Sequence, residues 1–101
     1  MAIHDLIDQD GRLFAFEVDN SRLGRKKICK ILTSIPGIQI LRKPIFMSEF
    51  REEVFCEFEL NGLKFEVWEP FGDNSRYWIG PEPVLTTEQI KTVREAFVPH
   101  C

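Results

Sequence analysis

The sequence predicts an α+β protein, a two-layer sandwich in which two helices pack on one face of a mainly antiparallel sheet. Three observations support this prediction. Alternating apolar and polar segments outnumber helical ones, Asn61-Gly62 separates two alternating runs, and two apolar stripes at helical spacing follow residue 27 and residue 89. The 101 residues suit a single α+β domain covering residues 1–101.

The N-terminal segment predicts two strands joined by a turn. Residues 3–7 form a short apolar segment, and residues 8–11, Asp-Gln-Asp-Gly, favour a turn. Residues 12–18 alternate with a period of two, which is typical of a strand. The apolar residues on one face of this strand are Phe14, Phe16 and Val18.

A helix is expected over residues 21–35. Asp19, Asn20 or Ser21 can cap its start, and Pro36-Gly37 ends it. Gly24 should weaken the first turn. The apolar stripe of this helix consists of Leu23, Ile28, Ile31, Leu32 and Ile35.

Residues 38–43 predict the next strand, and residues 44–53 a longer connection with several apolar side chains. Residues 54–69 carry the clearest local signal, because Asn61-Gly62 favours a type I′ turn, whose two central residues need positive φ angles. This turn sets the register of a hairpin.

The register pairs residues on both faces of that hairpin. The expected core pairs are Leu60 with Leu63, Phe58 with Phe65 and Cys56 with Val67; the other face pairs Glu59 with Lys64, Glu57 with Glu66 and Phe55 with Trp68. Because two opposed carboxylates repel each other, we expect a neighbouring Lys or Arg to compensate Glu57 and Glu66.

The C-terminal segment predicts one more strand and one more helix. Residues 76–79 return as a strand, after a turn at residues 72–75. Thr86 is expected to begin the last helix, with Gln89 completing a capping box. Its buried stripe is Ile90, Val93 and Phe97.

Composition restricts the class of protein. A net charge of −3 and 44% hydrophobic residues describe an ordinary globular chain. No apolar run approaches the roughly 20 residues needed to cross a bilayer, and the first residues are acidic, so we expect a cytoplasmic protein without membrane contact. Neither a metal site nor a cofactor site is predicted, because the cysteines and histidines lack metal-binding spacing. These residues are Cys29, Cys56, Cys101, His4 and His100.

The candidate binding site lies within residues 66–83, which hold both tryptophans and the only tyrosine. Aromatic residues beside charged ones are typical of recognition surfaces, since they give contact area at little entropic cost. The predicted binding residues are Trp68, Glu69, Arg76, Tyr77 and Trp78. A purely structural interpretation has Arg76 bridging to Glu69 or Glu66, and it places the tryptophans in the core.

These observations favour a small, acidic, non-enzymatic binding protein that recognises a protein partner through the aromatic and acidic sheet face and the hairpin over residues 72–81. In size and charge it is comparable to inhibitor or immunity-type proteins, which is an analogy only. An enzyme is less favoured, because no phosphate-binding, nucleophile-elbow or metalloprotease motif is present.

Two other functions stay open. The first is a small anionic-ligand binder or enzyme with a pocket between the sheet and residues 44–53, in which Arg76 holds the anion and Glu69 or Tyr77 acts as base or acid. The second is nucleic-acid binding through the helix over residues 21–35. Its basic residues include Arg22, Arg25, Lys26 and Lys30, within an acid-free window over residues 20–48.

Nucleic acid is the less favoured partner, because the exposed aromatic residues it requires occur here among acids instead. A homodimer that joins the acidic face of one copy to the basic helix of another is also compatible with this charge distribution.

Overall fold

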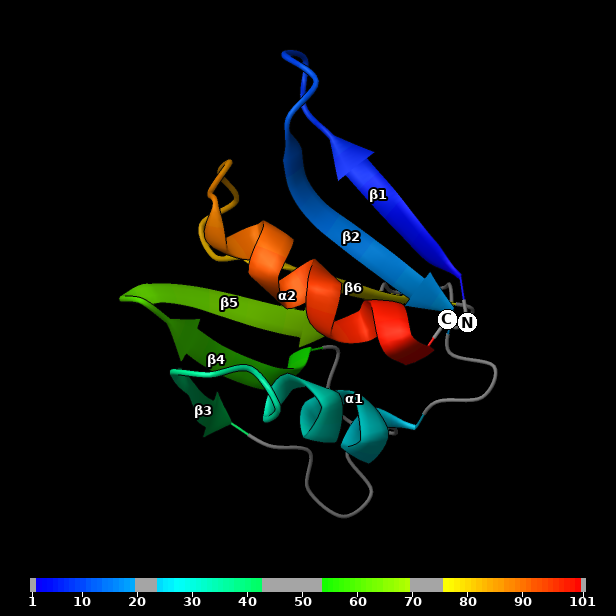
Figure 1. The fold of residues 1–101 in the computed structure, drawn as a ribbon, viewed down its shortest axis with the longest axis vertical. Helices are drawn as coiled ribbons and strands as arrows, with labels where there is room; N and C mark the ends of the chain where they lie inside the picture. Colours follow the sequence, from blue (N-terminus) through cyan, green and yellow to red (C-terminus); the bar gives the residue numbers. More distant parts are fainter. Residues whose placement is uncertain (1, 20–23, 43–53, 70–75, 101) are drawn as a thin grey trace.

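The computed structural model describes residues 2–19, 24–42, 54–69 and 76–100. It confirms the predicted α+β fold: a six-stranded antiparallel sheet is covered on one face by two helices (Figure 1). The strands are β1 (Ile3–Ile7), β2 (Leu13–Asp19), β3 (Ile38–Arg42), β4 (Val54–Leu60), β5 (Leu63–Trp68) and β6 (Arg76–Pro81). The helices are α1 (Arg25–Leu32) and α2 (Gln89–Phe97), and a short 3-10 turn, η2 (Val98–His100), follows α2.

The strand order is β1-β2-β6-β5-β4-β3, so β2 and β6 lie side by side although 56 residues separate their ends in the chain. The N-terminal β1–β2 hairpin and the β4–β5–β6 meander are therefore joined into one sheet by the pairing of β2 with β6. The candidate residues of β5 and β6 therefore lie on the two central strands of the sheet.

The β4–β5 hairpin confirms the predicted turn and most of the predicted register. Asn61 and Gly62 both have positive φ, of 52° and 81°. The observed pairs include Phe58 with Phe65 and Glu57 with Glu66, as expected. One expectation is wrong: Val54, rather than Phe55, lies opposite Trp68.

A register shift between Val54 and Cys56 explains that correction, because it adds one residue to β4. Phe55 consequently turns to the helix-covered face, where it is fully buried and makes an edge contact with Tyr77 at 5.2 Å between ring centroids. Phe55 therefore belongs to the core and not to the second face of the hairpin.

The core lies between the sheet and the helices. Phe97 of α2 packs edge-on against Phe16 of β2 at 5.4 Å, and Phe58 of β4 stacks on Phe65 of β5 at 5.1 Å between ring centroids. Cys29 of α1 meets Cys56 of β4. The cysteines at these two positions are thus small buried side chains, as expected.

Both helices begin later than predicted. Gly24 is extended and precedes α1 as its N-cap, because its φ and ψ of −81° and 167° are not helical. At the second helix the predicted capping box of Thr86 and Gln89 is wrong, because α2 begins at Gln89 and its N-cap is Glu88, whose side chain makes no capping hydrogen bond. The Thr86 hydroxyl donates a 2.7 Å hydrogen bond to the Asp8 carboxylate. Instead Thr87 accepts a hydrogen bond of 3.3 Å from the Ile90 amide at the start of α2.

The expected turn at residues 72–75, the connection over residues 44–53 and the side chain of Cys101 lie outside the described residues. Within the described ranges, no helix is long and apolar enough to cross a membrane.

Candidate functional site

The five predicted binding residues lie on two different faces of the sheet. Along β6, Tyr77 and Ile79 point toward the helices and are buried, so Arg76 and Trp78 point to the opposite face. Trp78 is the cross-strand partner of Trp68 on β5, which therefore shares that face. We call the face that the helices leave uncovered the open face; Trp68, Arg76 and Trp78 lie on it.

Tyr77 and Glu69 lie on the helix side instead. Tyr77 is only 5% exposed and packs against Phe55. Glu69, which follows β5, accepts hydrogen bonds from two guanidinium nitrogens of Arg25, at 2.7 Å from Nη2 and 3.1 Å from Nε. The structure thus brings together three of the five residues and places the other two behind them.

The Trp78 indole packs over Gly80, which lies two residues further along β6, beside Ala15 of the neighbouring strand β2. A Cβ atom added to Gly80 would lie 2.6 Å from Cη2 of the Trp78 indole and 2.9 Å from the Cβ of Ala15. Ala15 itself is fully buried. The six-membered ring of the indole therefore lies over Gly80 beside Ala15, and only small residues leave room for it there.

The two tryptophans form a cross-strand aromatic pair at the centre of the open face. Their ring centroids are 5.9 Å apart, and their planes are tilted by 58°. Aromatic cross-strand pairs stabilise a sheet and restrict the rotamers of both rings. Both side chains remain partly exposed, so the pair presents a fixed apolar surface to the outside.

Carboxylates surround this pair on the β4–β5 side. Glu57 lies directly opposite Glu66, as predicted, and Lys64 supplies the expected compensation with its Nζ 3.3 Å from Glu57 Oε2. The same ammonium lies 3.5 Å from Glu82 Oε2. Burial, then the neighbouring charges of Glu82 and Glu57, raises the pKa of Glu66 above its usual value.

Arg76 bridges to the neighbouring strand β2. Its Nη1 lies 3.2 Å from Glu17 Oε1, and its Nε lies 3.9 Å from Asp19 Oδ1. The expected bridge from Arg76 to Glu69 or Glu66 is therefore wrong, because β2, rather than β5, supplies its acidic partners. Asp19 also accepts from the His4 ring at 2.9 Å, and this hydrogen bond is the main cause of the lowered pKa of Asp19.

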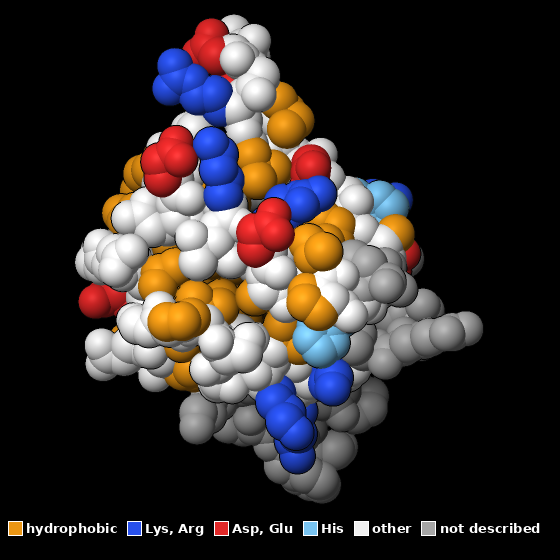
Figure 2. Space-filling model, viewed as in Figure 1, with side chains coloured by type: hydrophobic (Ala, Val, Ile, Leu, Met, Phe, Trp, Pro, Cys, Tyr) orange, Lys and Arg blue, Asp and Glu red, His pale blue; other side chains and the backbone are white. Residues whose placement is uncertain are grey.

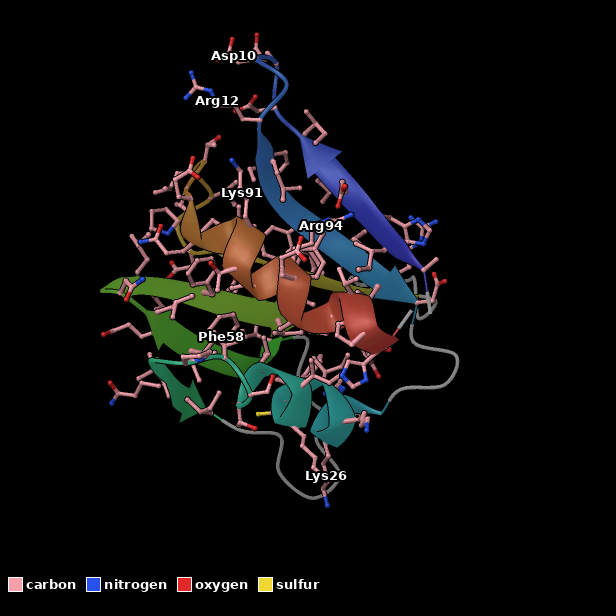
Figure 3. All side chains as sticks on the ribbon, in the orientation of Figure 1. Asp10, Arg12, Lys26, Phe58, Lys91 and Arg94 are labelled. Carbon is pink, nitrogen blue, oxygen red and sulfur yellow. The ribbon has the colours of Figure 1, made fainter. Side chains whose placement is uncertain are left out.

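The predicted basic patch separates into a structural residue and exposed ones. Arg25 is only 8% exposed, and its guanidinium lies 4.6 Å above the Phe55 ring while it binds Glu69. Lys26 and Lys30 are exposed, and Lys26 points away from the sheet (Figure 3). Arg22 lies outside the described residues, as does the connection that the pocket hypothesis requires.

Sequence reasoning missed three open-face contributors: Ala15, Glu17 and Gly80. No motif marks them, because they come from strands that become neighbours only through the β2–β6 pairing. The polarity of Glu17 within the alternating β2 segment was the one available signal, and it indicated a solvent-facing position without naming its neighbours.

The helix-covered face is less distinctive. Hydrophobic and charged side chains are interspersed over it in the view of Figure 2.

A hollow of about 290 Å³ lies between the β1–β2 turn and the start of α2, and it is lined by Ile7, Gly11, Arg12, Leu13, Thr86, Thr87, Glu88 and Lys91. Within the described part of the chain, no group of His, Cys, Asp or Glu is arranged to hold a metal ion.

Comparison of the chain with models of protein families, with curated proteins and with solved structures finds no match. The candidate site is a tryptophan pair bordered by the β4–β5 carboxylates on one side and by Arg76 with its acidic partners Glu17 and Asp19 on the other.

Proposed function

We propose that this chain is a non-enzymatic binding protein that recognises a protein partner through the open face of its sheet. The observation that carries the proposal is the position of Trp78. Its indole is fixed over Gly80 and against Trp68, on the face that the two helices leave uncovered. A rigid, partly exposed aromatic pair loses little entropy on binding, which is why tryptophan is enriched among the residues that dominate binding energy.

The residues behind this face have a supporting role in the proposal. Tyr77 fills the core directly below the sheet, and the Arg25–Glu69 pair fixes α1 to the end of β5, next to Trp68. These contacts support the backbone of β5 and β6 beneath the two tryptophans.

The alternative functions receive less support. An anion held by Arg76 would have to compete with Glu17 and Asp19, which lie 3.2 Å and 3.9 Å from its guanidinium nitrogens. Nucleic-acid binding through α1 would proceed without Arg25, whose charge is directed at Glu69. We keep the cytoplasm as the proposed compartment, since free thiols at Cys29 and Cys56 suit a reducing environment.

Affinity capture from an extract of the cells that make the protein tests the proposal. Trp68→Ala and Trp78→Ala should each lose a captured partner that the wild-type protein retains, with a loss of about 2 kcal/mol or more in affinity for a binding hot spot. Val98→Ala serves as the matched control, because it removes an exposed apolar side chain from the C-terminal turn η2.

Circular dichroism and thermal unfolding of each variant establish that the fold is intact. A partner that binds the folded Trp68→Ala and Trp78→Ala variants as well as it binds the wild type would exclude the open face as the binding site. Should Trp78→Ala fail to fold, Trp68→Ala and the charge reversal Arg76→Glu address the same face.

A further inference from the structure

We propose that Cys29 and Cys56 are a modification site: a low-molecular-weight disulfide such as oxidised glutathione converts the two thiols into one intramolecular disulfide, which ties α1 to β4. In reducing surroundings the pair stays in the dithiol form seen in this structure. The proposal goes beyond the proposed binding function and does not depend on it, because its test measures thiols and thermal stability and not partner binding.

The positions of the two sulfur atoms carry the proposal. Cys56 Sγ donates a hydrogen bond to Cys29 Sγ at 3.4 Å, so the two side chains already point at each other. A disulfide bond is about 2.05 Å long, and the sulfur atoms therefore need to approach each other by roughly 1.4 Å. Rotation of the two side chains and a small shift of α1 can supply that movement, so the fold does not have to rearrange.

The fold brings the two thiols together although 27 residues separate them in the chain. Cys29 follows Ile28 on the buried side of α1 and is 5% exposed. Cys56 lies opposite Val67 on the helix-covered side of β4 and is fully buried. Both belong to the hydrophobic core. Filling space in a core requires no contact between two sulfur atoms, whereas disulfide formation does.

A metal ion is the other ligand that a pair of thiols can bind. Structural zinc takes about four ligands in a tetrahedral arrangement. Within the described ranges, no group of three or more His, Cys, Asp or Glu is placed to hold a metal ion. The two cysteines therefore fit a two-electron oxidation better than a metal site.

The oxidation proceeds by two thiol–disulfide exchanges. In the first, the thiolate of one cysteine attacks a sulfur atom of oxidised glutathione; a protein–glutathione bond forms, the glutathione disulfide bond breaks, and one glutathione thiolate leaves. In the second, the thiolate of the other cysteine attacks the protein sulfur atom of this mixed disulfide, so the Sγ–Sγ bond forms and the second glutathione thiolate leaves. The two thiol protons pass through solvent to the two leaving thiolates. The protein loses two electrons, and oxidised glutathione is reduced to two molecules of glutathione.

Burial determines when this chemistry occurs. The hydrogen bond to Cys29, then burial, raises the pKa of Cys56, so the thiolate that must attack is scarce in the closed fold. The exchange therefore begins when α1 and β4 separate locally. The pair resists a brief exposure to an oxidant and responds to a sustained one.

The disulfide fastens α1 to the sheet by closing a loop of the chain between residues 29 and 56. A link of this kind reduces the number of conformations of the unfolded chain, which stabilises the folded state. By thermodynamic linkage, the folded state stabilises the disulfide to the same extent. The folded protein should therefore hold the disulfide more tightly than the unfolded chain does.

The test measures the equilibrium between dithiol and disulfide in a glutathione redox buffer, on the full chain with Cys101→Ser so that only these two thiols react. Remaining thiols are alkylated after unfolding and counted by mass spectrometry, and peptide mapping identifies the bond. The folded protein should form the Cys29–Cys56 bond with an equilibrium constant at least about tenfold above that of the same chain in urea. The oxidised protein should melt about 5 °C or more above the reduced protein.

Two controls accompany this measurement. Because burial slows the exchange, the equilibrium is approached from both sides, from the reduced chain and from chain that is oxidised in urea and then refolded. Cys29→Ser and Cys56→Ser, each combined with Cys101→Ser, keep a single thiol and should form no intramolecular bond. Cys29→Ala and Cys56→Ala replace them should the serine variants not fold, since alanine buries no hydroxyl group.

Four results would overturn the proposal. The first is a folded chain that settles in the dithiol form from both sides, at a glutathione ratio that oxidises it in urea. The second is an equal equilibrium constant in the folded and the unfolded chain. The third is an oxidised form that melts below the reduced form, and the fourth is a stable mixed disulfide with glutathione in place of the Cys29–Cys56 bond.

Discussion

The indole of Trp78 lies so close to Gly80 that a methyl group at residue 80 would come within 2.6 Å of its Cη2 atom. No ordinary Cβ approaches another heavy atom so closely, so the absence of a side chain at residue 80 and the position of the ring depend on each other. This relationship decides whether the open face presents a fixed aromatic surface.

Gly80→Ala should therefore destabilise the protein by about 1–3 kcal/mol, because overpacking forces either the indole or the strand to move. The same substitution should cost less in a Trp78→Ala background, where the ring is gone and only the contact with Ala15 remains. Denaturant unfolding of the four proteins gives this coupling as a double-mutant cycle. Equal costs in both backgrounds would mean that the ring does not depend on Gly80.

The contact between Arg25 and Glu69 gives a second prediction. Arg25→Ala should lower the free energy of unfolding by about 2–4 kcal/mol, since it removes the guanidinium hydrogen bonds to a largely buried carboxylate and the stacking on Phe55. Arg25→Lys should lose less stability than Arg25→Ala, because lysine keeps the positive charge. Some loss should remain, because an ammonium cannot reproduce the two guanidinium hydrogen bonds to Glu69.

Lys26→Ala is the matched control for that prediction, as an exposed base at the next position of the same helix; it should change stability by less than about 0.5 kcal/mol. Chemical denaturation monitored by circular dichroism measures all three variants. Similar stability losses in Arg25→Ala and Lys26→Ala would show that the pair adds nothing to the fold.

Local patterns predicted the strands and the hairpin well, because alternation and a positive-φ turn are properties of neighbouring residues. The turn at Asn61-Gly62 sets the pairs Phe58 with Phe65 and Glu57 with Glu66 without the help of any tertiary contact. The same reasoning failed at Phe55, since the extra residue of a β-bulge leaves no signature in an alternating segment.

The site was harder to predict, because its neighbours are distant in the chain. Glu69 and Arg25 are separated by 44 residues, and Arg76 finds its acid 59 residues away at Glu17. The sequence singled out Trp68, Glu69, Arg76, Tyr77 and Trp78 together. Alternation along β6 separates Tyr77 from Arg76 and Trp78, whereas the face of Trp68 follows from its pairing with Trp78 across β5 and β6.

The raised pKa of Glu66 predicts that the stability of the fold depends on pH. Its pKa is raised in the folded protein above the ordinary 4.5, so the folded state binds this proton more tightly than the unfolded state does. Stability from this group is therefore lost as the pH rises from about 4.5 through the folded-state pKa. Glu66→Gln should be more stable than the wild type at pH 7, by less than about 1 kcal/mol because solvent screens a partly exposed carboxylate.

That advantage should disappear below pH 4, where Glu66 is protonated in both states. Thermal unfolding at pH 7 and at low pH measures it, with Glu95→Gln as the control from the exposed surface of α2. A Glu66→Gln variant that is less stable than the wild type at pH 7 would mean that the ionised carboxylate stabilises the fold.

The two described thiols give the last prediction. Cys56 donates a hydrogen bond to Cys29 at 3.4 Å between sulfur atoms, and this contact together with burial raises the pKa of Cys56. Because both thiols are buried and the reactive thiolate of Cys56 is disfavoured, neither thiol should react with an aromatic disulfide reagent in the native protein. Both should react at once in denaturant, and native-state labelling should proceed only as fast as the protein opens.

Cys101→Ser provides the background that limits the reaction to these two residues. Rapid labelling of either thiol in the native Cys101→Ser protein would show that α1 separates readily from β4, and that the Arg25–Glu69 pair does not hold this helix in place.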